Sequence, residues 1–138
     1  MNALLADLEI GKAGLEINLV TAPEITRLNE KFLHHGSSTD VITFDYRDKD
    51  WSGKFLPALH GEIFVCVDEA VSQARRFGTS WQSETVRYVV HGVLHLLGHD
   101  DLHAAARRKM KHEENRLVRE LSRRFSLAQL ARCTRIVT

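Results

Sequence analysis

Apolar and polar residues follow one another along the chain in the periods typical of strands and helices. Residues 15–20 alternate between apolar and polar, which predicts a half-buried strand. Residues 63–67 are almost all apolar and predict a strand inside a sheet, and a β-rich run at 40–44 predicts another strand. Because segments with a helical period separate these runs, we expect an α/β or α+β fold, with a small mixed β-sheet packed against helices.

Capping residues and glycines indicate four helices, at about residues 21–33, 68–78, 80–98 and 104–125. We expect Asp68 to cap the second helix and Ser80 or Ser83 to cap the third. The third is apolar nearly all round, so we expect it to be the central helix of the fold.

Length and composition indicate one ordinary globular domain. The chain has 138 residues, of which 43% are hydrophobic and 27% charged. These values exclude collagen-like, low-complexity and largely disordered proteins. Since domains of about 100–150 residues are the commonest, we expect residues 1–138 to form a single domain.

Charge is distributed unevenly along the chain. The formal net charge is +1, yet residues 1–103 carry 9 Lys and Arg against 15 Asp and Glu, whereas residues 104–138 carry 10 against 3. A basic C-terminal third is compatible with binding of a polyanion, and equally with a solvated helix face.

Nothing in the sequence indicates export or a membrane. The first residues lack the basic start and long apolar stretch of a signal peptide, and no segment has about 18 uninterrupted apolar residues. Cys66 and Cys133 form neither a metal-type pair nor a disulfide scaffold. We therefore expect a cytoplasmic protein with no membrane partner.

The candidate chemistry lies at the end of the central helix. His91 and His95 are four residues apart, so both imidazoles lie on one helix face, where they can bind one metal ion. Gly98 can take the left-handed conformation that ends a helix and turns the chain back. The residues behind it, 99–101, are therefore candidates for a third ligand. Three protein ligands with an open position for water are typical of catalytic rather than structural zinc.

Gly92 distinguishes this chain from the zinc proteases. Zinc proteases carry the sequence HExxH, in which the glutamate beside the first histidine is the general base. This chain has Gly92 at that position. A zinc metalloprotease therefore stays an alternative only if the base comes from elsewhere.

The segment from His91 to Asp100 resembles the hallmark of the YbeY-type endoribonucleases, bacterial rRNA maturation factors, which reads H-G-x-L-H-L-x-G-[YH]-D-H. Asn29 followed by residues 38–44 is similar to the N…TDVLSF block of that family, and residues 61–63 are similar to its G-[DE]-I strand. The similarity spans roughly residues 15–125.

The resemblance implies a metal-dependent, single-strand-specific endoribonuclease that acts in rRNA maturation, at the 3′ end of the small-subunit rRNA, and in ribosome quality control. The implied cofactor is one zinc ion per chain, or another divalent transition metal. The implied partners are rRNA and the ribosomal small subunit, together with ribosomal proteins and assembly GTPases, and not DNA.

One departure from the family pattern concerns the third ligand. The third family histidine falls on Asp101. Since a carboxylate also binds zinc, the resemblance implies a metal site of His91, His95 and Asp101 with altered affinity or metal preference. His99 and His103 are alternatives for the third position. The general base is not assigned.

A second departure concerns the substrate phosphate. The family arginine, four residues after the asparagine, falls on Leu33, which removes the most obvious cation for a developing phosphorane charge. Arg27 or Lys31 could substitute for it. The same departure favours an alternative function, a ribosome assembly factor in which the metal is mainly structural and nuclease activity is weak or absent.

Three further residues are candidates for contacts around the site. The resemblance implies that Thr39 and Asp40 line the cleft beside the metal, although both also suit a turn and a cap. Glu62 is a candidate to orient a ligand imidazole, with a strand-edge charge as the alternative.

Overall fold

The strands form one mixed sheet in which β3 is central. A computed structural model describes residues 1–8, 13–33, 40–46 and 59–127. Its strands are β1 (Ala13–Val20), β2 (Val41–Asp45) and β3 (Leu59–Cys66), in the spatial order β1-β3-β2. β1 runs parallel to β3 and β2 antiparallel to it, so that Ile63 pairs with Ile17 on one side and Thr43 on the other.

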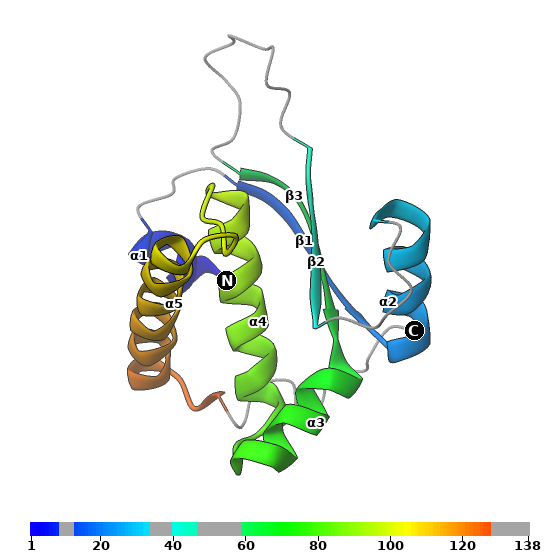
Figure 1. The fold of residues 1–138 in the computed structure, drawn as a ribbon. Helices are drawn as coiled ribbons and strands as arrows, with labels where there is room; N and C mark the ends of the chain where they lie inside the picture. The colour runs from blue at the N-terminus through cyan, green and yellow to red at the C-terminus, as the bar shows by residue number, and fades with distance from the viewer. Residues whose placement is uncertain (9–12, 34–39, 47–58, 128–138) are drawn as a thin grey trace, which may run out of the picture.

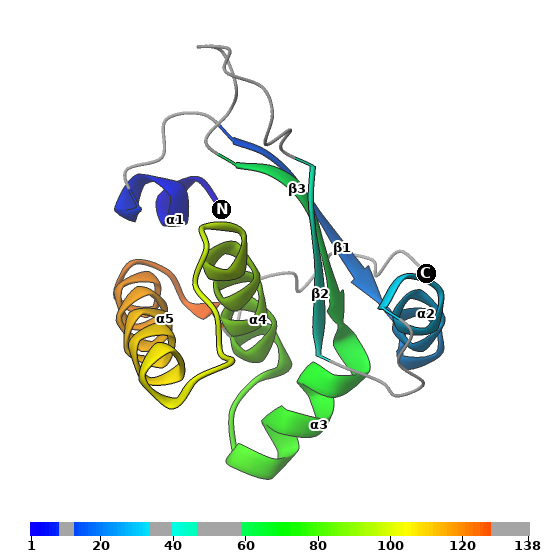
Figure 2. The same cartoon turned by 45° about the horizontal axis from the view of Figure 1, so that its top comes forward.

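Helices cover both faces of this sheet. They are α1 (Asn2–Asp7), α2 (Ala22–Leu28), which continues into the π-helical turn η1 (Asn29–Leu33), α3 (Val67–Phe77), α4 (Trp81–Leu96) and α5 (Ala104–Arg124). Figure 1 shows α4 against one face of the sheet, α5 on the side of α4 that is turned away from the sheet, and α2 on the opposite side of the sheet. The turned view in Figure 2 shows the same layers, with α1 beside α4 and α5.

The core explains the apolar run over residues 63–66 of β3. Leu59, Ile63 and Val65 are fully buried, in a cluster that also contains Val93 of α4 and Leu117 of α5. A second, smaller cluster on the α2 side contains residues 20, 25, 42 and 66. Because both faces of the central strand are covered, an almost continuous apolar run is stable there.

These observations confirm the predicted α+β fold with a small mixed sheet and a central helix, α4, that carries His91 and His95. β3 begins at Leu59, earlier than the predicted strand. None of the described helices combines the length and hydropathy needed to cross a bilayer.

The helix caps agree with the sequence in one case and differ in another. Ser80 caps α4 as predicted, because its side chain accepts a hydrogen bond from the amide of Ser83 at 3.2 Å. Asp68 does not cap its own helix, which begins one residue before it. Its carboxylate accepts a hydrogen bond at 2.7 Å from the amide of Ala22, at the start of α2. The prediction was wrong because the orphan amide of a distant helix lies within reach of this side chain.

Candidate metal centre

The histidine pair lies on α4 beside Gly92, where this helix packs closely against the sheet. A Cβ atom added to Gly92 would lie 3.0 Å from Cγ2 of Ile63 and 3.2 Å from Cγ2 of Thr43. Residue 92 therefore faces β2 and β3 without space for a side chain, while its neighbour His91 lies on another face of the helix. The glutamate of an HExxH protease would not fit here without moving the helix from the sheet.

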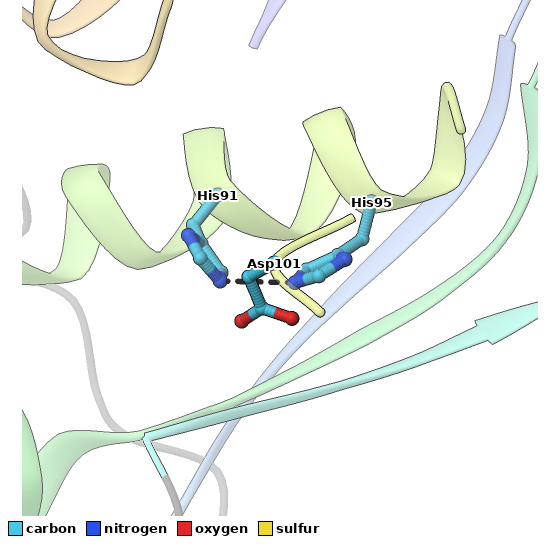
Figure 3. A group of neighbouring side chains, drawn as sticks. All are labelled: His91, His95 and Asp101. Carbon is cyan, nitrogen blue, oxygen red and sulfur yellow. Dashed lines mark hydrogen bonds between the residues drawn. The ribbon is translucent and has the colours of Figure 1, made fainter. Parts of the chain in front are cut away.

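The structure brings together the three predicted metal ligands. One ligand atom each from His91, His95 and Asp101 lies within 4.8 Å of the others. Figure 3 shows Asp101 on the loop after α4, beside the two imidazole rings. Gly98 has a φ of 101°, the left-handed conformation that allows the chain to turn back after the helix. His99 and His103, the alternatives for the third position, do not belong to this group.

The hydrogen bonds of the two imidazoles leave both Nε2 atoms facing each other. Nδ1 of His91 lies 2.8 Å from Oε1 of Glu114, and Nδ1 of His95 lies 3.1 Å from the backbone carbonyl of His99. Both partners are acceptors, so each Nδ1 is assigned the proton and donates it. The two Nε2 atoms are 3.0 Å apart and each presents a lone pair to the other. A cation placed against both lone pairs would relieve their repulsion, so this donor set fits a metal ion.

Burial favours the neutral form of the second imidazole. His95 is half-buried, and burial lowers its pKa below the usual value of 6.5. The neighbouring His91 lowers this pKa further, against an opposing effect of Asp101. Neutral imidazole is the form that binds metals.

Glu114 on α5 is the functional residue that the sequence analysis missed. Its side chain is buried, and its carboxylate accepts hydrogen bonds from Arg87 at 2.8 Å and Lys111 at 3.0 Å, besides the one from His91. Burial opposes its ionisation, but the three hydrogen bonds outweigh burial and lower its pKa to about 2. Glu114 is therefore a carboxylate that fixes the ring of His91 and directs Nε2 away from α5.

A signal for Glu114 exists in the sequence. It falls in register with Met110, Leu117 and Leu121, the buried face of α5, whereas Glu113 beside it is less buried. An acidic residue at a core position is rarely buried without a partner, and such a residue is a candidate for a specific polar contact.

The role predicted for Glu62 as the group that orients a ligand imidazole is corrected by these contacts. Its carboxylate accepts hydrogen bonds from Asn18 at 3.2 Å and from the hydroxyl of Tyr46 at 2.9 Å. Side chains alternate along a strand, and Ile63 points to α4, so Glu62 points to the other face of the sheet. Among the described residues, the contact to His91 is made by Glu114 instead.

A pocket of about 510 Å³ adjoins the metal group, and Asp40 belongs to its wall together with His91 and Asp101. Asp40 is thus beside the candidate site, as the sequence analysis expected, while Thr39 lies outside the described residues. Arg27 and Lys31 line a different pocket, next to Phe64, and not this one. They are therefore poorly placed to replace a cation at the metal group.

Comparison with known proteins decides the family. Residues 1–122 match the family model described as Endoribonuclease YbeY. The chain belongs to this family. The match confirms the resemblance seen in the sequence, and it places the protein in a family of hydrolases named for cleavage of RNA.

Individual YbeY relatives are clearly similar. The chain is 38% identical over 103 residues to the endoribonuclease YbeY of Salinibacter ruber, covering 73% of this chain and 66% of the relative. It is 41% identical over 105 residues to that of Elusimicrobium minutum, covering 75% and 72%. The solution structure of the Thermotoga maritima protein TM1509 matches with a TM-score of 0.57 and 29% identity, over 87% of this chain and 82% of the other.

Proposed function

We propose that this YbeY-family protein is a metal-dependent endoribonuclease that cleaves single-stranded RNA. The observation that carries the proposal is the convergence of His91, His95 and Asp101 at the edge of a pocket large enough for a nucleotide fragment. Zinc, or another divalent transition metal, would supply a Lewis acid there and lower the pKa of a water to near neutrality.

The residues of the chain have separate roles in this proposal. His91 and His95 would hold the metal through Nε2, and Asp101 through its carboxylate. Glu114 and the carbonyl of His99 would keep the two rings in the orientation that leaves Nε2 free. Asp40 would contact the substrate from the wall of the pocket.

The proposed setting is the maturation of rRNA, including 3′-end processing in the small subunit, and ribosome quality control. The proposed partners are the ribosomal small subunit, ribosomal proteins and assembly GTPases, and the proposed location is the cytoplasm. Membership of the YbeY family supports this setting, as does the excess of basic residues in the C-terminal third. We also propose that residues 1–138 act as one domain.

The test measures metal content and RNA cleavage in the same preparations. We expect wild type to contain about one transition metal per chain and to cut single-stranded RNA in preference to a duplex. A variant with His91→Ala and His95→Ala should lose both properties. His112→Ala removes an exposed histidine of α5 outside the metal group and should lose neither. Undiminished cleavage by the metal-free double variant would refute the proposal.

The second candidate function is a ribosome assembly factor with a structural metal. Leu33 in place of the family arginine favours it. In that case wild type would bind rRNA precursor without cutting it faster than the double variant, and removal of the metal would lower the melting temperature.

A further inference from the structure

The pocket beside the metal group is lined by four cations, two of which are already engaged. Arg87, Arg107, Arg108 and Lys111 all border it. Arg87 donates to Glu114 and Asn115, and Lys111 donates to Glu114. Both side chains are therefore paired with the same carboxylate within the protein.

The other two cations are not compensated in this way. Nη1 of Arg107 lies 3.5 Å from the backbone carbonyl of Asp101, which places this guanidinium next to a candidate metal ligand without pairing it to an anion. Arg108 is exposed and forms no hydrogen bond or ion pair within the part of the chain that the structure describes. Both side chains have donors to offer to a group bound in the pocket.

The stability of α5 does not explain why these cations are there. Acidic residues stabilise the start of a helix and basic residues destabilise it, because the N-terminus carries a partial positive charge. α5 has no acidic residue in its first turn and no side-chain hydrogen bond at its cap, His103. Instead Arg107, Arg108 and Lys109 follow one another close to that end. Helix stability therefore gives no reason for the basic residues at this end of α5.

We propose that Arg107 and Arg108 bind a backbone phosphate of the RNA strand in this pocket, next to the metal ligands. The proposal rests on the proposed function for the identity of the ligand. In this proposal, residues at the start of α5 make the phosphate contact that the family arginine would make from position 33, where this chain has Leu33. A guanidinium is suited to this contact because its planar fork can donate two hydrogen bonds to one phosphate.

The test uses the full chain, loaded with its metal, and a short single-stranded RNA labelled for fluorescence anisotropy. Affinity is measured at several salt concentrations for wild type, Arg108→Gln and a double variant with Arg107→Gln and Arg108→Gln. Arg119→Gln is the matched control, because it removes the same charge about three turns further along α5, from a residue outside the pocket. Metal content and the integrity of the RNA are checked in each preparation.

The slope of log affinity against log salt is negative, and each lost phosphate contact should reduce its magnitude by about 0.7 for a single strand. Because both side chains are assigned to one phosphate, we expect the double variant to reduce the magnitude of the slope by about 0.7 and Arg108→Gln to reduce it by no more than that, with weaker binding at low salt. Arg119→Gln should keep the wild-type slope. Equal slopes for the double variant and Arg119→Gln would overturn the proposal.

Cleavage by wild type, measured in parallel, separates this proposal from the proposed function. If wild type cuts the RNA and the double variant keeps the slope of the control, the phosphate site is wrong and the nuclease function stands. If wild type does not cut the RNA and the slope becomes less steep only in Arg108→Gln and the double variant, the phosphate site stands and the nuclease function is wrong.

Discussion

The buried carboxylate of Glu114 connects the metal group to the packing of α4 against α5, and its neutralisation is the most informative single perturbation. Glu114→Gln keeps the size and shape of the side chain but removes its charge. Arg87 and Lys111 would then point at a neutral amide, and the amide could turn its NH₂ group toward Nδ1 of His91. We expect a loss of both stability and metal affinity.

The magnitude follows from the pKa. Folding lowers the pKa of Glu114 from 4.5 to about 2. Since one pKa unit corresponds to about 1.4 kcal/mol, the charge contributes on the order of 3 kcal/mol to the free energy of unfolding at neutral pH. Loss of a group that orients a metal ligand typically weakens metal binding by about 10–100-fold.

The sign of the pH dependence follows from the same shift. Because the folded-state pKa is depressed, this stabilisation is fully present above about pH 4.5 and is lost as the pH falls toward 2. The free energy of unfolding of Glu114→Gln should therefore depend less on pH than that of wild type across this window.

The assay is urea denaturation of the metal-free proteins at several pH values, together with competition for zinc against a chromophoric chelator. Glu113→Gln is the control, since it makes the same chemical change at the next residue, where the carboxylate pairs with Arg116 and is more exposed. If Glu114→Gln matched Glu113→Gln in unfolding midpoint and in zinc affinity, the argument that Glu114 orients His91 would be refuted.

Three further predictions concern packing, an unpaired hydroxyl and metal preference. Gly92→Ala should destabilise the protein by about 1–3 kcal/mol in thermal unfolding, because its Cβ would meet Ile63 at 3.0 Å; an increase in stability, as helix propensity alone predicts, would contradict the close packing. Tyr88→Phe should leave stability unchanged or raise it by up to about 1 kcal/mol, because the Tyr88 hydroxyl is buried without a partner among the described residues; a clear loss in denaturant would reveal a partner. Asp101→His should raise the affinity for zinc relative to manganese in chelator competition, since imidazole suits zinc and carboxylate suits manganese; an unchanged ratio would remove Asp101 from the ligand set.

The sequence was most informative where helix geometry alone decides the outcome. His91 and His95 share a helix face because of their spacing, and Gly98 ends the helix because of its own conformational freedom. These local relations hold whatever else packs around them, and so a third ligand close behind Gly98 could be anticipated. The choice of Asp101 among residues 99–101 came from the family resemblance.

The contacts that escaped prediction join segments far apart in the chain. Glu114 is 23 positions from His91, and the two meet only because α5 packs on α4. The expected role of Glu62 failed for the related reason that the pleat of β3 turns its side chain to the far face of the sheet. Strand register and helix packing decide such contacts, and neither can be recognised in the pattern of apolar and polar residues along a short stretch of sequence.

The hydrogen bond from the amide of Ala22 to Asp68 makes the start of one helix depend on residues 46 positions later. α2 has seven regular residues, and an isolated helix of that length is unstable in water. Its cap depends on the parallel pairing of β1 with β3, because this pairing brings the start of α3 to the same end of the sheet as the start of α2. Slow hydrogen exchange of the Ala22 amide should therefore report the pairing of β1 with β3 rather than the persistence of one helical turn.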